Sequence, residues 1–279
     1  MMKGDKVQDP AKAIPEGSCR GSCGTVSKCD IFDFMAKFVG MTVIHPGGFA
    51  ATRKLIQAMG VGRHSRVVDI ACGKGTTAIL LAEEYGCEVV GLDLAPELID
   101  EAVFLAKKRG LGERVTFRVG DALDLPFGND EFDAAVSQAM LVLIEDKVKA
   151  IQEARRVIKP KGAAGWLELS WRRPVPPEFL RLLSEVICAY CMTNVQTFKG
   201  WEDIFRAAGV ADVNIMPLDF SPAAGGFFSM LKDEGLFRTF KIMRNISRSP
   251  EIKARMKSMR RYFKDYEDYF ACGVYTFRK

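Results

Sequence analysis

Apolar and polar positions in the middle of the chain alternate in blocks that predict strands and helices in turn. Short apolar runs of strand length are followed by segments with apolar residues at helical spacing. The pattern predicts strands at 66–71, 88–94, 115–122, 132–140 and 163–171, and helices at 76–85, 96–110 and 146–162. Alternation at this spacing implies parallel βαβ units with right-handed crossovers, so we expect an α/β fold with a doubly wound, Rossmann-like sheet.

The segments on either side extend this pattern. Before the sheet, the spacing predicts an amphipathic helix at 30–41, capped by Asp30, and a helix at 49–59 that ends at Gly60. After the sheet, it predicts helices at 178–192 and 200–209, a strand at 213–220, a mostly helical insertion at 222–265 and a strand at 270–279. These two strands bring the predicted sheet to seven strands.

The domain organisation follows from this pattern and from the composition of the N-terminal part. Residues 1–28 are rich in Gly, Ser, Pro and Lys and are expected to form a flexible leader. Residues 29–279 are expected to form one domain, in which 29–60 make a helical lid and 222–265 make a wall of the substrate pocket. Aromatic and Met side chains of the insertion are the expected wall residues, namely Phe227, Phe228, Met230, Phe237, Phe240 and Met243.

Composition and charge narrow the class of protein. The 279 residues are 48% hydrophobic and 27% charged, as in soluble globular enzymes, and no apolar run of about 20 residues could span a bilayer. A cytoplasmic location without stable membrane insertion is therefore expected. The net charge of +5 is concentrated in 232–264, where eleven Lys or Arg face three acids. That stretch would suit an anionic substrate or peripheral membrane contact, or it is a solvated helical face.

Nucleic acid is an unfavoured partner, because the central part of the chain lacks a broad basic surface with interleaved aromatic residues. A small-molecule acceptor suits the sequence better. The sequence does not indicate the oligomeric state.

The eight cysteines fit a reducing compartment, because five of them are scattered without a disulfide-like framework. Those five are Cys72, Cys87, Cys188, Cys191 and Cys272. Cys19, Cys23 and Cys29 could join Cys188 and Cys191 in a thiolate metal or metalloid site. Their spacing matches no zinc pattern and no His lies near them, so no metal ligands are predicted.

The stretch VVDIACGKGTTAILLA, residues 67–82, places a glycine-rich turn between a strand and a helix. In open α/β sheets, ligands bind beyond the carboxyl ends of the strands, beside such a turn. Residues 73–78 also satisfy the G-x-G-x-x-G/A dinucleotide pattern, and Asp93 follows at the distance expected for a ribose contact, so an NAD-dependent oxidoreductase is one alternative. Asp69 argues against it, since a carboxylate at the strand end would repel a pyrophosphate and attract an ammonium or sulfonium group.

A third acid, Asp121, follows the third strand, where it could accept a hydrogen bond from an adenine amino group. Three acids at strand ends therefore suit a cationic adenosyl ligand. The successive segments VVDIACGKG, VVGLD, VGDALDLPF, FDAAVSQ and RVIKPKGAAGWLEL resemble, in order and spacing, the motifs of the class I S-adenosylmethionine-dependent methyltransferases. The resemblance is strong over 66–170 and looser beyond. Within the family, the sequence most resembles the small-molecule methyltransferases typified by the ubiquinone and menaquinone biosynthesis enzymes.

The resemblance implies S-adenosylmethionine as cofactor and methyl transfer to a small molecule by in-line displacement. It implies that residues Ala71, Cys72, Gly73 and Gly75 line the methionine part, with Asp69 beside them. It also implies that Asp93 binds the ribose, Leu94 packs on the adenine, Asp121 and Ala122 meet the adenine amino edge, and Ser137 and Gln138 lie near the methyl group. Ordinary helix capping at strand–helix turns is the alternative role for the acids.

Two features of the site remain open at the level of sequence. Ala71 stands where the family's first loop glycine is expected, which is tolerated if its φ is negative. If the acceptor loses a proton, His45 before a Pro-Gly-Gly turn and Glu168 at the end of a strand are the candidate bases, although each could instead have a local structural role. A metalloid methyltransferase using the thiols of Cys19, Cys23 and Cys29 is the remaining alternative.

Overall fold

A mostly parallel sheet forms the centre of the computed structural model, which describes residue 31 and residues 34–186, 190–221 and 227–279. Within these ranges the sheet has eight strands in the order β3-β2-β1-β4-β5-β8-β7, with β6 paired to β5. The strands are β1 Arg66–Ile70, β2 Glu88–Asp93, β3 Val115–Val119, β4 Phe132–Gln138, β5 Ile158–Trp171, β6 Gln196–Thr197, β7 Asn214–Leu218 and β8 Phe270–Arg278. Strand β8 is antiparallel to both its neighbours.

The doubly wound α/β prediction is confirmed, with one strand more than expected. The additional strand, β6, has only two residues and pairs in parallel with Ser170 and Trp171 at the end of β5. A strand of that length has no alternation of apolar and polar residues to reveal it.

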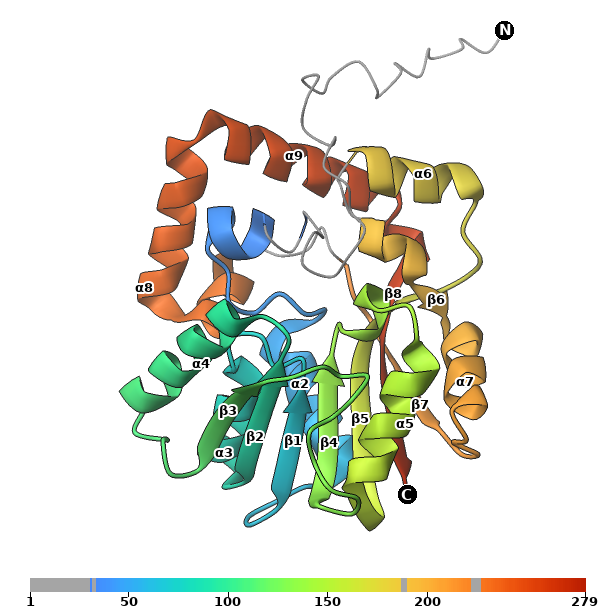
Figure 1. The fold of residues 1–279 in the computed structure, drawn as a ribbon. Coiled ribbons are helices and arrows are strands. Elements are labelled where there is room, and N and C mark those ends of the chain that lie inside the picture. The colour runs from blue at the N-terminus through green and yellow to red at the C-terminus, as the bar shows by residue number, and fades with distance from the viewer. Residues whose placement is uncertain (1–30, 32–33, 187–189, 222–226) are drawn as a thin grey trace, which may run out of the picture.

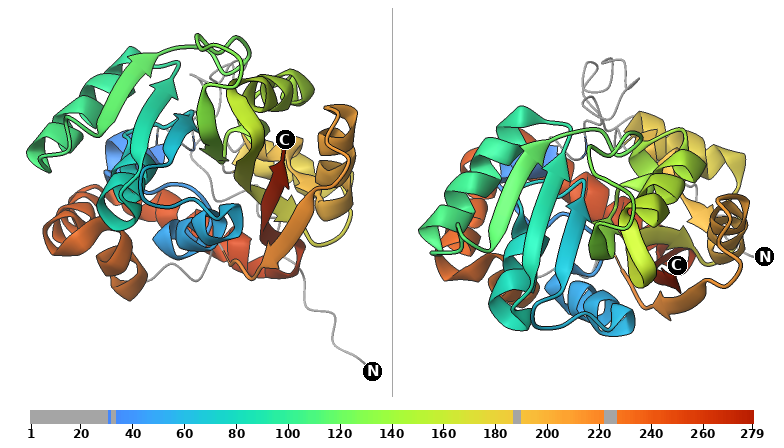
Figure 2. Two further views of the ribbon diagram at one scale, coloured as in Figure 1. Left: turned by 90° about the horizontal axis from the view of Figure 1, so that it is seen from below. Right: turned by 60° about the horizontal axis from the view of Figure 1, so that its bottom comes forward.

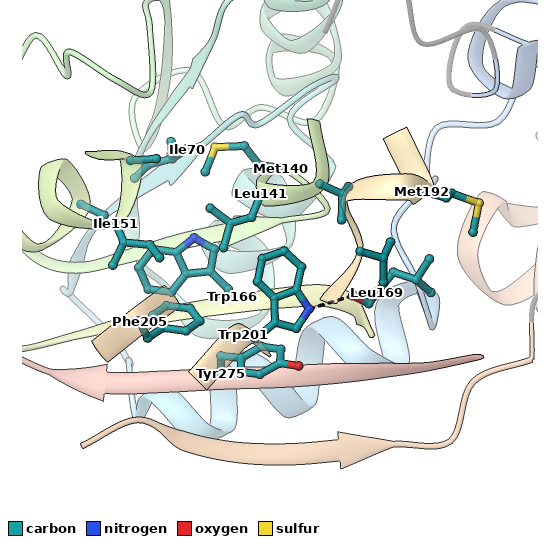
Figure 3. Close-up of a cluster of buried hydrophobic side chains, with 14 of the residues drawn as sticks. Ile70, Met140, Leu141, Ile151, Trp166, Leu169, Met192, Trp201, Phe205 and Tyr275 are labelled. Carbon is teal, nitrogen blue, oxygen red and sulfur yellow. Dashed lines mark hydrogen bonds between the residues drawn. The ribbon is translucent and has the colours of Figure 1, made fainter. Parts of the chain in front are cut away.

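Helices cover both faces of the sheet, as Figures 1 and 2 show. Apolar residues of α2 Gly48–Met59, α3 Thr76–Tyr85 and α4 Pro96–Lys108 pack in one buried cluster, and those of α5 Lys147–Val157 and α7 Phe198–Ala207 pack in another. The second cluster is rich in aromatic residues, and in it Trp201 of α7 donates a hydrogen bond to the Leu169 carbonyl at 3.0 Å (Figure 3). These packed faces fix the strand ends that carry the site.

The helix predicted at 146–162 ends five residues earlier in the structure, since α5 ends at Val157 and β5 begins at Ile158. Pro160 lacks a backbone N–H and disfavours helical geometry in the residue before it, so the KPKG segment continues as strand instead of closing the helix. Asp146 caps α5, accepting a hydrogen bond from Lys149 N at 2.9 Å.

The predicted helix at 178–192 and the insertion are also more finely divided than expected. In the described part of the first, Pro177–Val186 form α6 and Tyr190–Asn194 form a short turn, η5. The described part of the insertion forms α8 Phe227–Arg248 and α9 Pro250–Asp265, separated by Ser249, whose side chain caps α9. Gly235, with φ 73° and ψ 170°, interrupts α8.

These helices, with a π-helical turn η3 Phe34–Val39, lie over the carboxyl ends of the parallel strands (Figure 1). Short turns η4 Leu141–Leu143 and η6 Glu267–Tyr269 complete that end of the molecule. The leader at 1–28 and the proposed cap Asp30 lie outside the described residues. In the described ranges, no helix combines the length and the apolar character required to cross a membrane.

Candidate active site

The glycine turn after β1 has an unusual backbone. Ala71, Gly73 and Gly75 all have positive φ, at 59°, 54° and 73°. The condition that Ala71 should keep a negative φ is therefore not met, and its Cβ sits in a left-handed conformation that costs roughly 1 kcal/mol. The two glycines differ in their surroundings: a Cβ on Gly75 would lie 2.5 Å from the Phe117 ring, whereas a Cβ on Gly73 would meet no atom within 4 Å.

Asp93, at the end of β2, fixes this turn. Its Oδ2 accepts a hydrogen bond from Gly73 N at 2.8 Å, and its Oδ1 accepts one from Ala95 N at 3.0 Å. The carboxylate therefore joins the turn after β1 to the turn after β2. Each oxygen keeps a lone pair for another donor.

Asp69 is buried in β1 beneath the same turn. It is 2% exposed, its carboxylate contacts the backbone of Ala78 near the start of α3, and its Oδ2 has no hydrogen-bond partner among the described residues. Burial, with a smaller contribution from the nearby Asp93 charge, raises the pKa of Asp69 to about 8. A buried, unpartnered carboxyl oxygen beside the turn fits a ligand that carries positive charge.

Cys72, within the turn, is buried. Burial is the main reason why the pKa of its thiol is well above the usual range, and the charges of Asp69 and Asp93 act in the same direction. The thiol is therefore protonated at neutral pH and is not a nucleophile.

The residues predicted to surround the adenine lie on the turns after β2 and β3. Leu94 is 57% exposed, so its apolar side chain is open to a ligand at this edge of the sheet. Asp121 is exposed, and its Oδ1 accepts a hydrogen bond from Leu123 N at 2.8 Å, while Ala122 is half-buried. The exposed apolar surface of Leu94 and the free oxygen of Asp121 suit a flat base between them.

Ser137 and Gln138 end β4, but they face different surroundings. Ser137 is fully buried and donates to the Ile70 carbonyl at 2.9 Å, which ties β4 to β1. Gln138 is half-buried and lies between two threonines: its Nε2 donates to Thr77 Oγ1 at 2.7 Å, and its Oε1 accepts from Thr52 Oγ1 at 3.0 Å. Gln138 thus joins α2 to α3 at the edge of the site.

This polar chain ends at His45. Thr52 Oγ1 lies 3.4 Å from His45 Nε2, and its single hydrogen is directed to acceptors, the Gln138 amide oxygen or the Gly48 carbonyl. In the tautomer that carries its proton on Nε2, His45 donates to Thr52 and Nδ1 keeps a lone pair. Nδ1 is buried and makes no well-formed hydrogen bond among the described residues. Burial lowers the pKa of His45 to about 4, although the Pro46 backbone opposes this shift, so the imidazole is neutral at pH 7.

Glu168, the other candidate base, is completely buried in β5. Its Oε1 accepts hydrogen bonds from Met140 N at 3.1 Å and Leu141 N at 3.0 Å, at the start of η4, while its Oε2 has no partner among the described residues. Burial raises the pKa of Glu168 to about 8, against the opposing effect of these backbone donors and of Lys147. The structure thus gives Glu168 a capping contact with η4.

A cavity of about 370 Å³ lies over the carboxyl ends of β4 and β5. Its lining comes from the N-terminal segment 34–48, from the turn after β4 and from the helical insertion, and His45 is one of its few polar side chains. Most of the others are apolar: Met35, Met41, Val43, Ile44, Val142, Leu169, Met192, Val195, Phe220, Met259 and Phe263. No Lys or Arg is found among the described residues that line it.

The insertion contributes to this cavity through side chains other than those expected. Ser229, Asp233, Met259 and Phe263 line it, whereas the aromatic and Met residues predicted as its wall do not. Of those six, five are between 37% and 89% exposed: Phe227, Phe228, Phe237, Phe240 and Met243. The apolar spacing of α8 therefore marks an outer surface as well as an inner one.

Two acids of α8 hold the N-terminal segment 34–48, and the sequence reasoning missed both. Glu234 accepts hydrogen bonds from Thr42 N at 2.7 Å, Thr42 Oγ1 at 2.6 Å and Val43 N at 3.0 Å. Asp233 Oδ1 accepts one from Phe49 N, at 3.0 Å, and caps the start of α2. These partners are 184 to 192 residues apart in the sequence, so only an acidic pair within an otherwise basic segment could have drawn attention to them.

Four of the five thiols of the hypothetical thiolate site, Cys19, Cys23, Cys29 and Cys188, lie outside the described residues. Cys87 and Cys272 are, like Cys72, buried free thiols. Within the described ranges, no group of three or more His, Cys, Asp or Glu is arranged to hold a metal ion.

Comparisons with known proteins agree with this geometry. Residues 67–162 match the methyltransferase domain family. A protein of unassigned function from Haemophilus influenzae is 33% identical over 238 residues, which cover 84% of this chain and 92% of that protein. The demethylmenaquinone methyltransferase of Geobacillus kaustophilus is 31% identical over 190 residues, 61% of this chain and 81% of that enzyme.

Solved structures share the fold at low sequence identity. MccD superposes with a TM-score of 0.70 at 18% identity, covering 85% of this chain and all of that one. A phosphoethanolamine N-methyltransferase from Haemonchus contortus, crystallised with S-adenosylhomocysteine, gives a TM-score of 0.67 at 22% identity and covers 90% of this chain and 57% of that one. The chain belongs to the class I S-adenosylmethionine-dependent methyltransferases, and it is an enzyme that uses S-adenosylmethionine as methyl donor.

Proposed function

We propose that this enzyme methylates a neutral, lipophilic small molecule held in the cavity between the N-terminal segment and the helical insertion. The observation that carries the proposal is the lining of that cavity, which is apolar apart from a few groups and includes no Lys or Arg among the described residues. An anionic acceptor would leave its charge unpaired there, at a cost of several kcal/mol. We therefore favour the lipophilic acceptor over the anionic one, and we assign lid and wall roles to these two segments.

The relatives support this choice of acceptor. A demethylmenaquinone methyltransferase and a tocopherol O-methyltransferase, both named for lipophilic substrates, share 31% and 37% identity with parts of this chain. An ajmaline N-methyltransferase, which is 37% identical over 91 residues, shows that the acceptor atom differs among relatives. A quinol or phenol with an apolar tail is the acceptor class that fits both the cavity and these relatives.

We also propose that S-adenosylmethionine binds to the residues on the turns after the first four parallel strands. When bound, S-adenosylmethionine supplies an electrophilic methyl group on a sulfonium centre. The open space beside Gly73 admits a ligand close to the backbone, and the unpartnered oxygen of Asp69 favours its positive charge. Asp93 keeps lone pairs for the ribose hydroxyls, and Leu94 with Asp121 and Ala122 receives the adenine.

Closer to the acceptor, we propose that His45 takes the acceptor proton. His45 lines the cavity and its imidazole is neutral at pH 7, and the polar contact of its Nε2 with Thr52, which in turn donates to Gln138, would hold the ring in place. Glu168 is fully buried and does not line the cavity, so we give it a positioning role on η4. Ser137 is proposed to set the spacing between β1 and β4, and the apolar lining to exclude water from the in-line displacement.

The acceptor proposal is tested with S-adenosylmethionine carrying a labelled methyl group. We expect label to move to reduced demethylmenaquinone and to simpler quinols with apolar tails, and not to phosphomonomethylethanolamine, a charged acceptor of similar chemistry. Val142→Asp, which places a charge in the cavity, should abolish transfer while S-adenosylmethionine binding persists. Methylation of the charged acceptor, without methylation of the quinols, would refute the lipophilic assignment.

The cofactor residues are tested separately by isothermal titration with S-adenosylmethionine, S-adenosylhomocysteine and NADH. Asp93→Ala removes two hydrogen bonds that fix the turn and the proposed ribose contact, so we expect binding of both adenosyl ligands to weaken by about 100-fold. Asp100→Ala, an exposed acid on α4, is the matched control. Binding of NADH in place of the adenosyl ligands would contradict the assignment.

The base proposal is tested by His45→Gln, whose amide can still donate to Thr52 but offers no basic nitrogen. We expect kcat to fall by about 10²-fold or more for a hydroxyl acceptor, with an unchanged dissociation constant for S-adenosylmethionine. A kcat within a factor of about two of the wild type would exclude His45 as the base.

The cytoplasm remains our proposed location, in keeping with the buried free thiols of Cys72, Cys87 and Cys272. Detection of the tagged protein in the soluble and membrane fractions of its cells would test it.

A further inference from the structure

The outer side of α8 carries a surface that the reaction does not use. Five large apolar side chains on it are strongly exposed: Phe228 at 77%, Leu236 at 52%, Phe237 at 89%, Phe240 at 57% and Met243 at 44%. At roughly 200 Å² per aromatic side chain, the three phenylalanines alone expose on the order of 400 Å². We call these five residues the α8 apolar patch; continuous patches of this size on single chains usually mark a binding surface.

The patch is continuous because of the way α8 is built. Leu236, Phe237, Phe240 and Met243 recur at helical spacing on one side, while Thr239 and Ile242 on the other side are fully buried. Gly235 breaks the helix, and Phe227 contacts both its neighbour Phe228 and, across the break, Phe240, with ring centroids 5.7 Å and 6.4 Å apart. The kink thus brings aromatic residues from both halves of α8 together.

Cations surround the patch, whereas the acids of the same helix face inward. Lys232, Lys241, Arg244 and Arg248 of α8 are exposed. The only two acids of α8, Asp233 and Glu234, are engaged with the N-terminal segment and the start of α2. The helix therefore presents apolar groups and positive charge outward without compensating negative charge.

An apolar surface bordered by Lys and Arg is the chemistry that recognises the interface of an anionic membrane. Helix α8 lies at the outer edge of the molecule, where a flat surface could approach it (Figure 1). The patch also borders the acceptor cavity, since Ser229, which lines the cavity, follows Phe228 of the patch in the chain. A second copy of the chain would have to accommodate the same uncompensated positive charge on both partners, which disfavours it as the occupant.

We propose that the α8 apolar patch and its flanking cations dock this enzyme on the surface of an anionic lipid bilayer, with the acceptor cavity next to the lipid. The docking goes beyond the proposed function, since it is a binding property that requires no acceptor and no methyl transfer. The membrane binding is peripheral and reversible. Aromatic side chains enter the headgroup region, and Lys and Arg side chains contact lipid phosphates.

The test is sedimentation of the full chain with large vesicles, either of phosphatidylcholine alone or of equal parts phosphatidylcholine and phosphatidylglycerol. We expect binding to the mixed vesicles, weakened by salt, and little binding to phosphatidylcholine. Phe237→Ser with Phe240→Ser should weaken binding by about tenfold or more, and Lys241→Glu with Arg244→Glu should do the same through charge. Phe104→Ser on α4, where the ring is 63% exposed, is the matched control and should bind like the wild type.

Folding and self-association are controlled in the same set. Melting temperature and S-adenosylmethionine titration should be unchanged in all variants, since the residues lie away from the proposed cofactor turns. The proposal would be overturned if the wild type bound to neither kind of vesicle. It would also be overturned if both double variants bound to the mixed vesicles as strongly as the wild type does. A wild-type dimer that becomes a monomer in the patch variant, seen by light scattering, would identify a second copy as the occupant and overturn it as well. Each of these outcomes is independent of whether a quinol is methylated.

Discussion

The two sides of the proposed active site are held together in different ways. On the cofactor side, backbone groups of nearby turns are joined by single side chains: Asp93 binds Gly73 N and Ala95 N, and Ser137 binds the Ile70 carbonyl. On the acceptor side, Glu234 receives three hydrogen bonds from Thr42 and Val43, residues far away in the sequence. The contacts on the cofactor side join turns at one edge of the sheet. The contacts on the acceptor side join the N-terminal segment to helix α8.

This difference has a physical consequence. Turns fixed by the ends of buried strands have little freedom to move, so the cofactor side is preorganised. The N-terminal segment 34–48 is held from outside the sheet, by polar contacts with α8 and by the buried side chains of Phe34, Val39 and Val43. We therefore expect changes on the two sides to be separable in stability, cofactor affinity and acceptor affinity.

The largest effects are expected from the two glycines of the cofactor turn, which form a matched pair. Gly75→Ala places a Cβ about 2.5 Å from the Phe117 ring at a positive φ, and it should destabilise the fold by about 3 kcal/mol or more. Gly73→Ala meets no protein atom and should cost about 1 kcal/mol from its backbone conformation alone. Its methyl group would instead occupy space proposed for the cofactor.

Urea unfolding and S-adenosylmethionine titration distinguish the two variants. We expect Gly73→Ala to be folded but to bind the cofactor at least about tenfold more weakly. If it binds like the wild type, the open space beside Gly73 is not the cofactor site.

A second effect, on the acceptor side, is expected from Glu234→Ala. Loss of three hydrogen bonds to a carboxylate should release the N-terminal segment and destabilise the protein by about 2 kcal/mol. The KM for the acceptor should rise by about tenfold, while the dissociation constant of S-adenosylmethionine should change by less than about twofold. Glu251→Ala, an exposed acid of the same insertion, is the control. Equal loss of affinity for both ligands would show that the two sides are not separable.

This division also explains what the sequence revealed. The cofactor side was readable because its signals are local: an apolar strand, a small-residue turn and a helix start follow one another, and the predicted helix at 76–85 has the bounds found for α3. The family motifs added the cofactor and the proposed roles of the residues at the strand ends. The predicted roles of Asp93 and Asp121 remain proposals, although both carboxylates lie at the edge where the pattern placed them.

What the sequence did not reveal depends on contacts between distant segments. The pairing of Glu234 with Thr42 leaves no periodic trace, and a helix with apolar residues on two sides, such as α8, does not show which side is buried. The positive φ of Ala71 was missed for a different reason. The residue type suggests a right-handed backbone, and the packing of the turn overrides that preference.

A third prediction concerns the pH dependence of stability and the buried Glu168 between the two sides. Because its pKa is raised to about 8 in the folded protein and is near the ordinary value when unfolded, the folded state holds a proton that the unfolded state has lost between about pH 4.5 and 8. Stability should therefore fall as the pH rises through this window, by up to about 1.4 kcal/mol per pH unit for this group. Asp69 should act in the same direction.

Glu168→Gln isolates the contribution of Glu168, since the amide oxygen can still accept from Met140 N and Leu141 N. We expect urea unfolding at pH 6 and pH 8 to show a smaller loss of stability in this variant than in the wild type. Glu113→Gln, an exposed carboxylate, should keep the wild-type slope. An unchanged slope in Glu168→Gln would mean that Glu168 is ionised throughout this pH range.

The smallest effect is expected where the two sides share one feature. Ala71 and Ala139 both have left-handed backbones, at φ 59° and 54°, the first in the cofactor turn and the second in the acceptor cavity. A glycine at either position relieves roughly 1 kcal/mol of backbone strain in the folded state. It also stabilises the unfolded chain by about 0.4–1 kcal/mol through greater backbone entropy, so the free energy of unfolding should change by less than about 0.5 kcal/mol. Chemical unfolding of Ala71→Gly and Ala139→Gly measures both. A loss above about 1 kcal/mol in Ala71→Gly alone would show that its methyl group packs on the core, so that the cofactor turn is held by side-chain packing as well as by Asp93.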